Sequence, residues 1–232
     1  MRRFQGIVPL IVVDGPAASG KSTLARRLGE ILGIPFISTG AMYRAVTLAA
    51  MRRGIRMTDK RALVRIARRL RLKFTGGKWP ATMKIMCEGR DISREIEAPE
   101  ISRNTSTFIA NVPEVREAIV EATRNHLTSR GLVAEGRDCG SVIFPNAPWK
   151  FFMSSTFQAR AHRRWRDLRK AGHQVSLKSL LMDMERRDRE DRTRPKGALI
   201  AVPDAWMVDN SGLEQAETLA LMLRRIDPDA VV

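Results

Sequence analysis

Short apolar runs alternate along the chain with segments in which apolar residues recur every three or four positions. The first run, residues 7–13, is rich in β-branched residues and is typical of a buried parallel strand. Leu24, Leu28, Ile31 and Leu32 then recur at helical spacing and predict a helix. The alternation continues to the end of the chain and predicts an α/β fold, with a parallel sheet of about five strands covered by helices on both faces. Further strands are expected at residues 35–38, 131–134, 149–153 and 205–209, and further helices at 39–54, 58–70, 99–109, 113–129, 156–170, 176–191 and 213–225.

One stretch follows a different pattern. Apolar and polar residues alternate over residues 70–75 and again over 83–87. Gly76-Gly77 separates the two segments and Glu88-Gly89 follows the second, and such pairs favour tight turns between antiparallel strands. We therefore predict a single domain over residues 1–232 that carries a small antiparallel β subdomain at about residues 70–97.

Residues 15–23, GPAASGKST, join the first predicted strand to the first predicted helix. They fit the pattern G-x-x-x-x-G-K-[ST], with Gly15, Gly20, Lys21 and Ser22 at its fixed positions. Backbone N–H groups at such a helix start bind phosphate, and the glycines let the chain approach it closely. Lys21 can reach the β- and γ-phosphates, and the Ser22 hydroxyl can ligate Mg²⁺. The segment predicts a binding site for a nucleoside triphosphate.

Arginine is concentrated in residues 160–169 and 186–194, which are separated by a glycine-containing break at 171–174. Two arginine-rich helix ends joined by a turn would form a lid over phosphates, because phosphoryl transfer needs neutralised charge and the exclusion of water. We place this lid at about residues 160–194. The alternative is a solvated basic surface.

Within the second arginine segment, Arg187, Asp191 and Arg194 are spaced so that one helical face can carry all three. This places a carboxylate, suited to sugar hydroxyls, beside two guanidiniums suited to phosphate. The segment therefore predicts a sugar-phosphate subsite on the lid.

Other charged residues follow predicted strands. Thr39 caps the helix after the second strand, and Arg44 lies in the first turns of that helix. Arg137 and Asp138 follow the strand at 131–134, so all are expected at the carboxyl edge of the sheet, where open α/β sheets bind ligands. Arg44 could equally be a surface charge, and Asp138 could be a magnesium ligand, a base-recognising carboxylate or a helix cap. The residues alone leave these alternatives open.

Composition narrows the class of protein. The chain has 41 Lys plus Arg against 25 Asp plus Glu, and its net charge of +16 suits a polyanionic partner such as nucleic acid or phosphorylated nucleotides. The excess is spread along the chain, so a general compositional bias explains it equally well. No apolar run approaches about 18 residues, so we expect no membrane span. With two distant cysteines, Cys87 and Cys139, we expect a cytoplasmic protein with free thiols, and its three histidines form no metal-ligand pattern.

The most informative sequence patterns lie in six stretches that run in order along the chain. They are GPAASGKSTLA (15–25), STGAMYRAV (38–46), EGRDCGSVIFPNAP (135–148), RAHRRW (160–165), RDREDRTRP (187–195) and PDAWMVDNSG (203–212). Together they resemble bacterial cytidylate kinases, nucleoside-monophosphate kinases of the P-loop fold. The resemblance covers almost the whole chain, and the predicted antiparallel sheet lies where this family has its monophosphate-binding subdomain.

The resemblance implies transfer of the γ-phosphoryl group of ATP to CMP or dCMP, which gives ADP and CDP or dCDP, with Mg²⁺ as cofactor. Residues that match the catalytic phosphate-binding side chains of the family are Lys21, Arg137, Arg187 and Arg194. The set that the resemblance assigns to ATP is Gly15, Pro16, Ala17, Ala18, Ser19, Gly20, Lys21, Ser22 and Thr23, together with Arg163 and Arg164 in the lid.

The resemblance also implies a site for the acceptor nucleotide. Cytosine carries a donor amine beside two acceptors, which suits a carboxylate from Asp138 and a guanidinium from Arg116. Uracil has an acceptor in place of that amine, so Asp138 is expected to disfavour UMP. The acceptor set is Thr39, Arg44, Thr107, Arg116, Arg137, Asp138, Arg187, Asp191 and Arg194, of which Arg187 and Asp191 face the ribose.

Two features qualify the match. Ser38 stands where the family often has Asp, and if that Asp arranges magnesium-bound water, Glu135 becomes the outer-sphere carboxylate here. No residue in the set is an obvious general base, and none is needed, because the attacking group is already a phosphate oxygen.

Two other functions remain open from the sequence. One is a P-loop kinase of another small acceptor, either a different monophosphate or shikimate. The other is a basic P-loop protein that binds nucleic acid, which is disfavoured because only 6% of residues are aromatic and no stacking platform is evident. We expect a monomer that binds ATP and CMP or dCMP and has no membrane or nucleic-acid partner.

Overall fold

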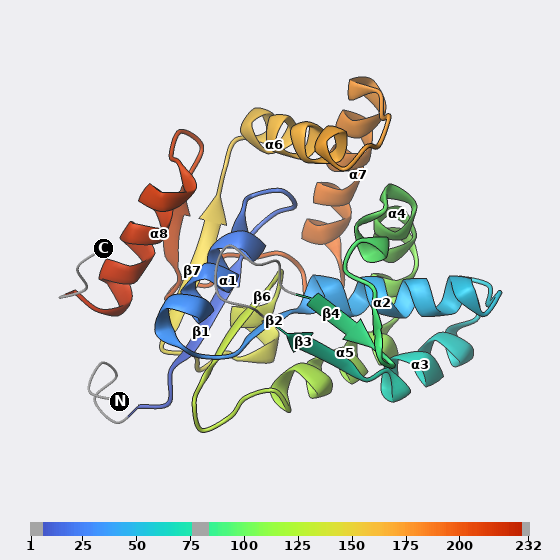
Figure 1. The fold of residues 1–232 in the computed structure, drawn as a ribbon, viewed down its shortest axis with the longest axis horizontal. Helices are drawn as coiled ribbons and strands as arrows, with labels where there is room; N and C mark the ends of the chain where they lie inside the picture. Colours follow the sequence, from blue (N-terminus) through green and yellow to red (C-terminus); the bar gives the residue numbers. More distant parts are fainter. Residues whose placement is uncertain (1–6, 76–83, 229–232) are drawn as a thin grey trace.

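A five-stranded parallel sheet forms the centre of the molecule (Figure 1). The computed structural model describes residues 7–75 and 84–228. The strands lie in the order β2-β6-β1-β7-β8, and each neighbouring pair is parallel, which confirms the predicted α/β fold. The strands are β1 (Leu10–Asp14), β2 (Phe36–Ser38), β6 (Leu132–Gly136), β7 (Trp149–Ser154) and β8 (Trp206–Asp209).

Helices cover both faces of this sheet, because its central strands are apolar on both sides. Along β1, Ile11 and Val13 belong to one buried cluster, and Val12 belongs to the other. The first cluster also contains α1 and α8, and the second contains α2, α3 and α5. These helices are α1 (Lys21–Leu32), α8 (Gln215–Ile226), α2 (Thr39–Arg52), α3 (Lys60–Arg69) and α5 (Pro113–Arg124).

A second, antiparallel sheet lies beside α2, as the alternating pattern predicts. Its order is β3-β4-β5, and a two-residue turn with positive φ at Glu88 and Gly89 joins β4 to β5. The predicted turn at Gly76-Gly77 lies outside the described residues. The sheet packs on one side of α2, and the short 3₁₀ helix η2 (Glu95–Glu97) follows it. Its strands are β3 (Leu72–Thr75), β4 (Lys84–Cys87) and β5 (Arg90–Asp91).

The two arginine segments form a pair of helices, α6 (Phe157–Lys170) and α7 (Leu177–Thr193). Thr156 and Ser176 cap them, each accepting a hydrogen bond from a backbone N–H in the first turn. The pair packs through a small apolar cluster of its own and lies above the carboxyl ends of the central strands in Figure 1. The predicted helices are confirmed; their role as a lid stays a prediction.

Several element boundaries differ from the expected ones. Ser38, not Thr39, caps α2, because the Ser38 hydroxyl accepts from the Ala41 N–H at 3.1 Å. Leu127 was expected on the buried face of a long helix, but α5 ends at Arg124 and Leu127 is exposed. An Asn at position 125 favours a helix end, since its side chain competes for backbone hydrogen bonds. The expected helix at 99–109 divides into α4 (Pro99–Thr107) and the 3₁₀ turn η3 (Ile109–Asn111).

The segment after β6 also departs from expectation. The strand continues through Glu135 and Gly136, which pair with the end of β1. After Arg137 and Asp138 the chain forms a single π-helical turn, η4 (Cys139–Ile143). Such turns are rare and occur often at functional sites, so this one marks a region for closer study.

We predict that Gly131, which precedes β6, tolerates no side chain. Its φ is +98°, and a Cβ would lie 2.2 Å from the Pro9 carbonyl oxygen. Gly131→Ala should lower the free energy of unfolding by more than about 2 kcal/mol, measured by urea denaturation. Gly33 provides the control, because its φ is +69° but a Cβ there would meet no other atom within 4 Å. Gly33→Ala should cost only about 1 kcal/mol, and equal losses would contradict the steric explanation.

Candidate active site

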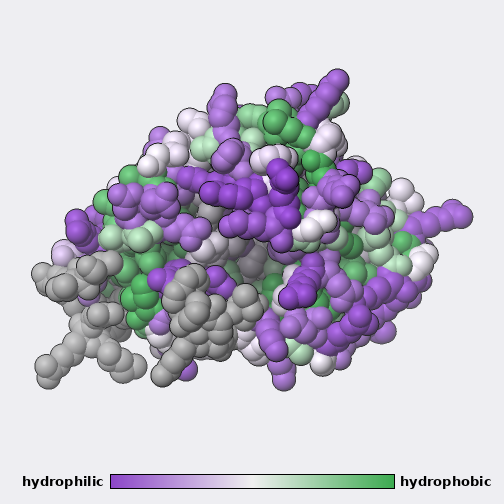
Figure 2. Space-filling model, turned by 45° about the horizontal axis from the view of Figure 1, so that its top comes forward, coloured by the Kyte–Doolittle hydropathy of each residue, from purple (hydrophilic) through white to green (hydrophobic). Residues whose placement is uncertain are grey.

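A cavity of about 1400 Å³ lies at the carboxyl edge of the parallel sheet. The glycine loop, the starts of α1 and α2, the segment after β6, and the helices α6 and α7 all contribute to its walls. Figure 2 shows hydrophilic side chains gathered around a hollow in the face that the view presents. We call this cavity the central pocket. Its position is the one at which open α/β sheets bind ligands.

The glycine loop forms one wall of the central pocket. Gly15 must lack a side chain, because a Cβ there would lie 2.7 Å from the Met153 carbonyl oxygen, and Gly20 has a φ of +84°. The loop leads into the first N–H groups of α1, as a phosphate site requires. Of the predicted ATP residues in this loop, those that line the pocket directly are Ala17, Ala18, Gly20, Lys21, Ser22 and Thr23.

Lys21 is buried, and its ammonium group donates to the Pro16 carbonyl at 3.0 Å. Burial, followed by repulsion from Arg137, lowers the pKa of Lys21 to about 7. An incoming phosphate would oppose both effects by supplying negative charge. The surroundings of Lys21 therefore favour the binding of an anion beside its ammonium group.

A cluster of charge faces Lys21 across the pocket. Asp191 accepts from Arg137 Nε at 2.7 Å and from Arg194 Nη2 at 2.8 Å, so both its oxygens are engaged. Burial alone would raise the pKa of Asp191, but Arg137, Arg187 and Arg194 outweigh it and hold the pKa well below its usual range. Arg194 lies just beyond α7, not within it, yet the predicted grouping of all three residues is present.

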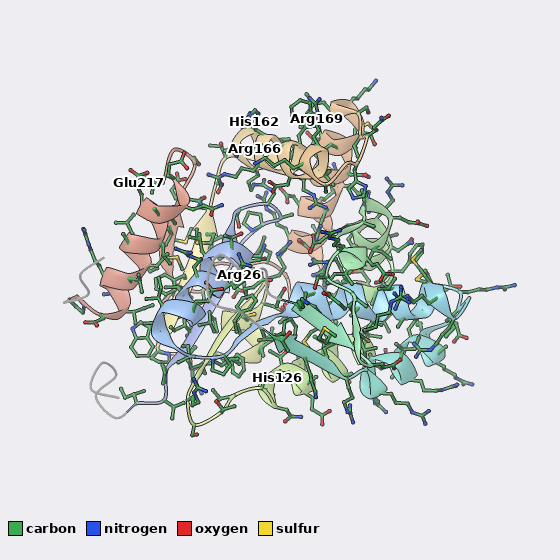
Figure 3. All side chains as sticks on the ribbon, viewed as in Figure 1. Arg26, His126, His162, Arg166, Arg169 and Glu217 are labelled. Atoms are coloured by element: carbon green, nitrogen blue, oxygen red, sulfur yellow. The ribbon has the colours of Figure 1, made fainter. Side chains whose placement is uncertain are left out.

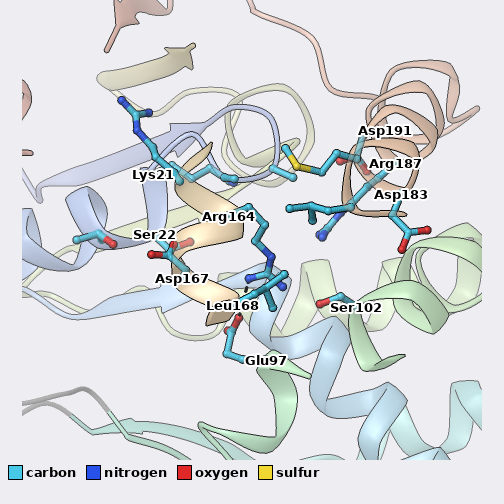
Figure 4. Close-up of a pocket in the computed structure, with 18 of the residues that line it drawn as sticks. Lys21, Ser22, Glu97, Ser102, Arg164, Asp167, Leu168, Asp183, Arg187 and Asp191 are labelled. Carbon is cyan, nitrogen blue, oxygen red and sulfur yellow. Dashed lines mark ion pairs between the residues drawn. The ribbon is translucent and has the colours of Figure 1, made fainter. Parts of the chain in front are cut away.

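Arg187 differs from its neighbours because its buried Nε has no hydrogen-bond partner among the described residues. Burial and repulsion from Arg137 lower its pKa to about 10. Figure 4 shows Arg187 and Arg164 extending toward the same space from α7 and α6. Since buried polar groups nearly always have partners, this guanidinium indicates a position for an anionic ligand.

Asp138 and Arg116, which are distant in sequence, form a buried ion pair beside Ala110. Arg116 also donates to the Ala110 carbonyl at 3.3 Å, and its guanidinium lies over the Tyr43 ring at 5.6 Å. Burial raises the pKa of Asp138, and the Arg116 charge opposes that rise. Both side chains line the central pocket, so acceptor and donor atoms lie side by side in its wall.

Asp138 does not act as a helix cap, one of the roles that the sequence left open, because its side chain makes no capping bond to η4. Asp14, at the end of β1, takes that role and accepts from the N–H groups of Cys139 at 3.0 Å and Gly140 at 2.7 Å. Burial raises the pKa of Asp14 to about 6. Sequence reasoning missed this residue, although an aspartate between a buried strand and a glycine loop was a visible signal.

Glu135 is held by the start of α2. The Ser38 hydroxyl donates to its carboxylate, and the Thr39 hydroxyl donates to its backbone carbonyl at 3.1 Å. Glu135 and Thr39 both line the central pocket. The Ser38 hydroxyl thus orients the neighbouring Glu135 carboxylate.

The remaining predicted residues have protein partners in this structure. Thr107 accepts from Arg186 at 2.9 Å and lies beside the pocket wall rather than in it. Arg163 donates to Ser155 and Asn210, which places it near the glycine loop, because Asn210 donates to the Ser19 carbonyl. Arg44 and Arg164 both lie against Glu97, which the sequence reasoning did not select.

The lid helices are joined to the glycine loop by Arg160, another residue that the sequence reasoning did not select. Its guanidinium forms a two-bond pair with Asp188 of α7, at 2.6 and 3.2 Å, and donates to the Ala17 carbonyl at 3.1 Å. Both side chains are buried. The pair ties α6, α7 and the loop together.

Other kinds of site were sought in the same part of the chain. Figure 3 shows His126 near the end of α5 and His162 on α6, on opposite sides of the molecule. Within residues 7–75 and 84–228, no three His, Cys, Asp or Glu side chains are placed to hold a metal ion by themselves. No helix in these ranges is both long and apolar enough to cross a bilayer. Cys87 and Cys139 are buried free thiols.

Comparison with known proteins agrees with this geometry. The family model described as cytidylate kinase matches residues 11–228. A cytidylate kinase from Bordetella pertussis is 40% identical over 218 residues, which are 94% of this chain and 95% of that protein. One from Desulfitobacterium hafniense is 38% identical over 213 residues, 92% of this chain and 90% of that protein. A solved structure of an uncharacterized protein from Eubacterium ventriosum has a TM-score of 0.50 at 14% identity, covers 95% of this chain and 98% of its own, and shows the fold alone.

The low pKa of Lys21 predicts that triphosphate binding takes up a proton. At pH 8 the free side chain is mostly neutral, and a bound triphosphate restores its charge. Calorimetric titration with ATP in buffers of different ionisation enthalpy should show an uptake of about one proton, and affinity should fall by up to about tenfold per pH unit above pH 7. Lys21→Met should abolish the uptake. The same uptake in that variant would assign the proton to another group.

Proposed function

This chain belongs to the cytidylate kinase family, and we propose that its central pocket transfers the γ-phosphoryl group of ATP to CMP or dCMP, giving ADP and CDP or dCDP. One observation carries the assignment to this pocket. A glycine loop of the phosphate-binding pattern and the buried Arg116–Asp138 pair line the same cavity, together with Arg137, Arg187 and Arg194. The cavity thus offers a triphosphate site and a base-recognition site on either side of a phosphate-binding centre.

The donor side consists of the glycine loop and the inner face of α6. Residues 15–23 would hold the phosphates of ATP through backbone N–H groups, and Lys21 would reach the β- and γ-phosphates. Arg163 and Arg164, which line the pocket from α6, would lie near the same phosphates. The anchoring of α6 to the Ala17 carbonyl through Arg160 supports this placement.

The acceptor side lies between α2, α5 and α7. Arg116 and Asp138 would recognise cytosine, with Thr107 beside them once it is released from Arg186. Arg44 would bind the acceptor phosphate, and Thr39 would contact the same region. Arg187 and Asp191 would face the ribose. Both Asp191 oxygens accept hydrogen bonds from arginines in this structure, so contact with a sugar hydroxyl would require one of those bonds to open.

Transfer itself would depend on position and charge. Arg137, Arg187, Arg194 and Lys21 all line the cavity, and they would surround the space between the two nucleotides, where the transferred group carries its negative charge. No general base is required, because a phosphate oxygen of CMP attacks directly. Closure of α6 and α7 would exclude water from this space.

The residues present fit a magnesium ion bound together with ATP. Ser22 is an exposed hydroxyl at the start of α1, and the buried Glu135 carboxylate lines the same pocket. Magnesium usually retains water and takes only one or two protein ligands beside substrate phosphates. Ser22 would be the direct ligand and Glu135 an outer-sphere one, and the ion would neutralise phosphate charge. We also propose a cytoplasmic location, which two buried free thiols support, and a monomeric state.

A substrate panel tests the proposed reaction. In a coupled assay of ADP release, CMP or dCMP should be the best acceptor among CMP, dCMP, UMP, AMP and shikimate. Lys21→Ala should lower turnover by about 10³-fold or more without unfolding the protein, checked by circular dichroism. Highest activity with AMP or shikimate would assign the enzyme to another acceptor, and near-normal turnover of the variant would remove Lys21 from the phosphate site.

Base recognition by Asp138 predicts a change of acceptor preference. Asp138→Asn preserves shape but places an amine where the cytosine amine needs an acceptor. The ratio of kcat/KM for CMP to that for UMP should fall by about tenfold or more. Asparagine is the preferable variant, because its carbonyl oxygen can still accept from the buried Arg116, whereas alanine would leave that guanidinium without an acceptor at this position. An equal loss with both nucleotides would mean that Asp138 does not read the base.

A further inference from the structure

Glu97 connects two arginines that come from opposite sides of the central pocket. Its Oε1 accepts from Arg44 Nη2 at 2.7 Å, and its Oε2 lies 3.8 Å from Arg164 Nη1. Arg44 belongs to α2 on the acceptor side and Arg164 to the lid helix α6, whereas Glu97 ends η2. Figure 4 shows Glu97 beneath Arg164, with the ion pair marked. Among the described residues, Glu97 is the ion-pair partner of both arginines and neither has another.

The electrostatic surroundings make Glu97 a permanent anion. Arg44, followed by Arg164 and Arg187, lowers the pKa of Glu97, so the side chain is charged at neutral pH. Glu97 does not fully satisfy the two guanidiniums. Arg44 Nε is buried without a hydrogen-bond partner among the described residues, and burial lowers the pKa of Arg164. A single carboxylate therefore partly neutralises guanidiniums that are suited to a stronger anion.

We propose that the Glu97 carboxylate occupies, in the unliganded enzyme, the position that the phosphate group of the acceptor takes against Arg44, so that CMP must displace it to bind. This inference rests on the proposed function, in which Arg44 binds that phosphate. Glu97 then sets the affinity for the acceptor. A nucleoside without a phosphate has no group to exchange for Glu97, so its binding leaves the Glu97–Arg44 pair in place.

Replacement of the Glu97 carboxylate by phosphate is favourable for Arg44 and is tolerated by Glu97. Phosphate carries more negative charge than a carboxylate and accepts more hydrogen bonds, so it is the stronger partner for an arginine. The Glu97 side chain is 52% exposed and can turn into water without leaving a buried charge unpaired, whereas Arg44 is only 16% exposed and stays in the pocket. Release of Glu97 also frees Arg164 for the donor side.

Glu97→Gln tests the inference, because it keeps the size of the side chain and removes its charge. KM for CMP should fall about threefold to fivefold, the effect of removing one partly exposed ionic competitor. KM for ATP should stay within about twofold, and inhibition by cytidine should not change, since cytidine has no phosphate. An unchanged or higher KM for CMP would overturn the inference and make Glu97 a residue that merely positions Arg44.

Glu95→Gln is the matched control. Glu95 belongs to the same 3₁₀ helix and pairs with Arg52 and Arg90, but it does not line the central pocket. Its substitution should leave KM for CMP unchanged, and an equal fall in both variants would indicate a general effect of charge and overturn the specific inference.

Arg44→Met separates this inference from the proposed function. If Arg44 binds the acceptor phosphate, its substitution raises KM for CMP. Adding Glu97→Gln to the Arg44→Met variant should then not lower this KM. An Arg44→Met variant with an unchanged KM would contradict both proposals. A raised KM in Arg44→Met together with an unchanged KM in Glu97→Gln would overturn only the role of Glu97.

Discussion

The structure depends on positive charge buried at the carboxyl edge of a parallel sheet. Lys21, Arg137, Arg187 and Arg194 converge on one cavity, and Asp191 pairs with two of them. Each charge removed from water costs several kcal/mol unless a partner compensates. Asp191 compensates only in part, as the lowered pKa values of Lys21 and Arg187 show. The cluster therefore favours an anion, which substrate phosphates would supply in the proposed reaction.

Buried polar contacts outside this cluster hold the segments that carry it. Asp14 fixes the turn after Asp138 through two backbone N–H groups, so the Arg116–Asp138 pair is anchored to the strand that precedes the glycine loop. Arg160 ties α6 and α7 to the same loop. The segments that carry the proposed donor and acceptor sites are thus joined at the end of β1 and the loop after it, which would suit a reaction whose catalysis rests on position.

The shape of the site also explains how one chain can use two similar nucleotides in different roles. The glycine loop recognises phosphates through backbone groups and does not depend on the base. The Arg116–Asp138 pair lies on the other side and offers a fixed pattern of donors and acceptors to a base edge. Glu97 lies between the arginines of the two sides and pairs with both. In the proposed reaction, phosphate recognition would thus be shared by the two nucleotides, whereas base recognition would belong to the acceptor alone.

The sequence by itself determined the order of the elements, the glycine loop and, through its motifs, the family; its assignment of individual site residues stays a prediction. Apolar periodicity marks strands and helices locally, and the loop works through backbone groups that need only the correct spacing, so Lys21 could be found without a fold. Only the tertiary structure showed that Arg116 pairs with Asp138, that Asp14 rather than Asp138 caps η4, and that Glu97 bridges two arginines. These contacts join residues far apart in the chain, and their partners are set by how α2 and α5 pack on the sheet and by where α6 and α7 lie above its carboxyl edge. Local sequence patterns do not reveal these partners, because each of these polar side chains, taken alone, is equally compatible with a solvated surface.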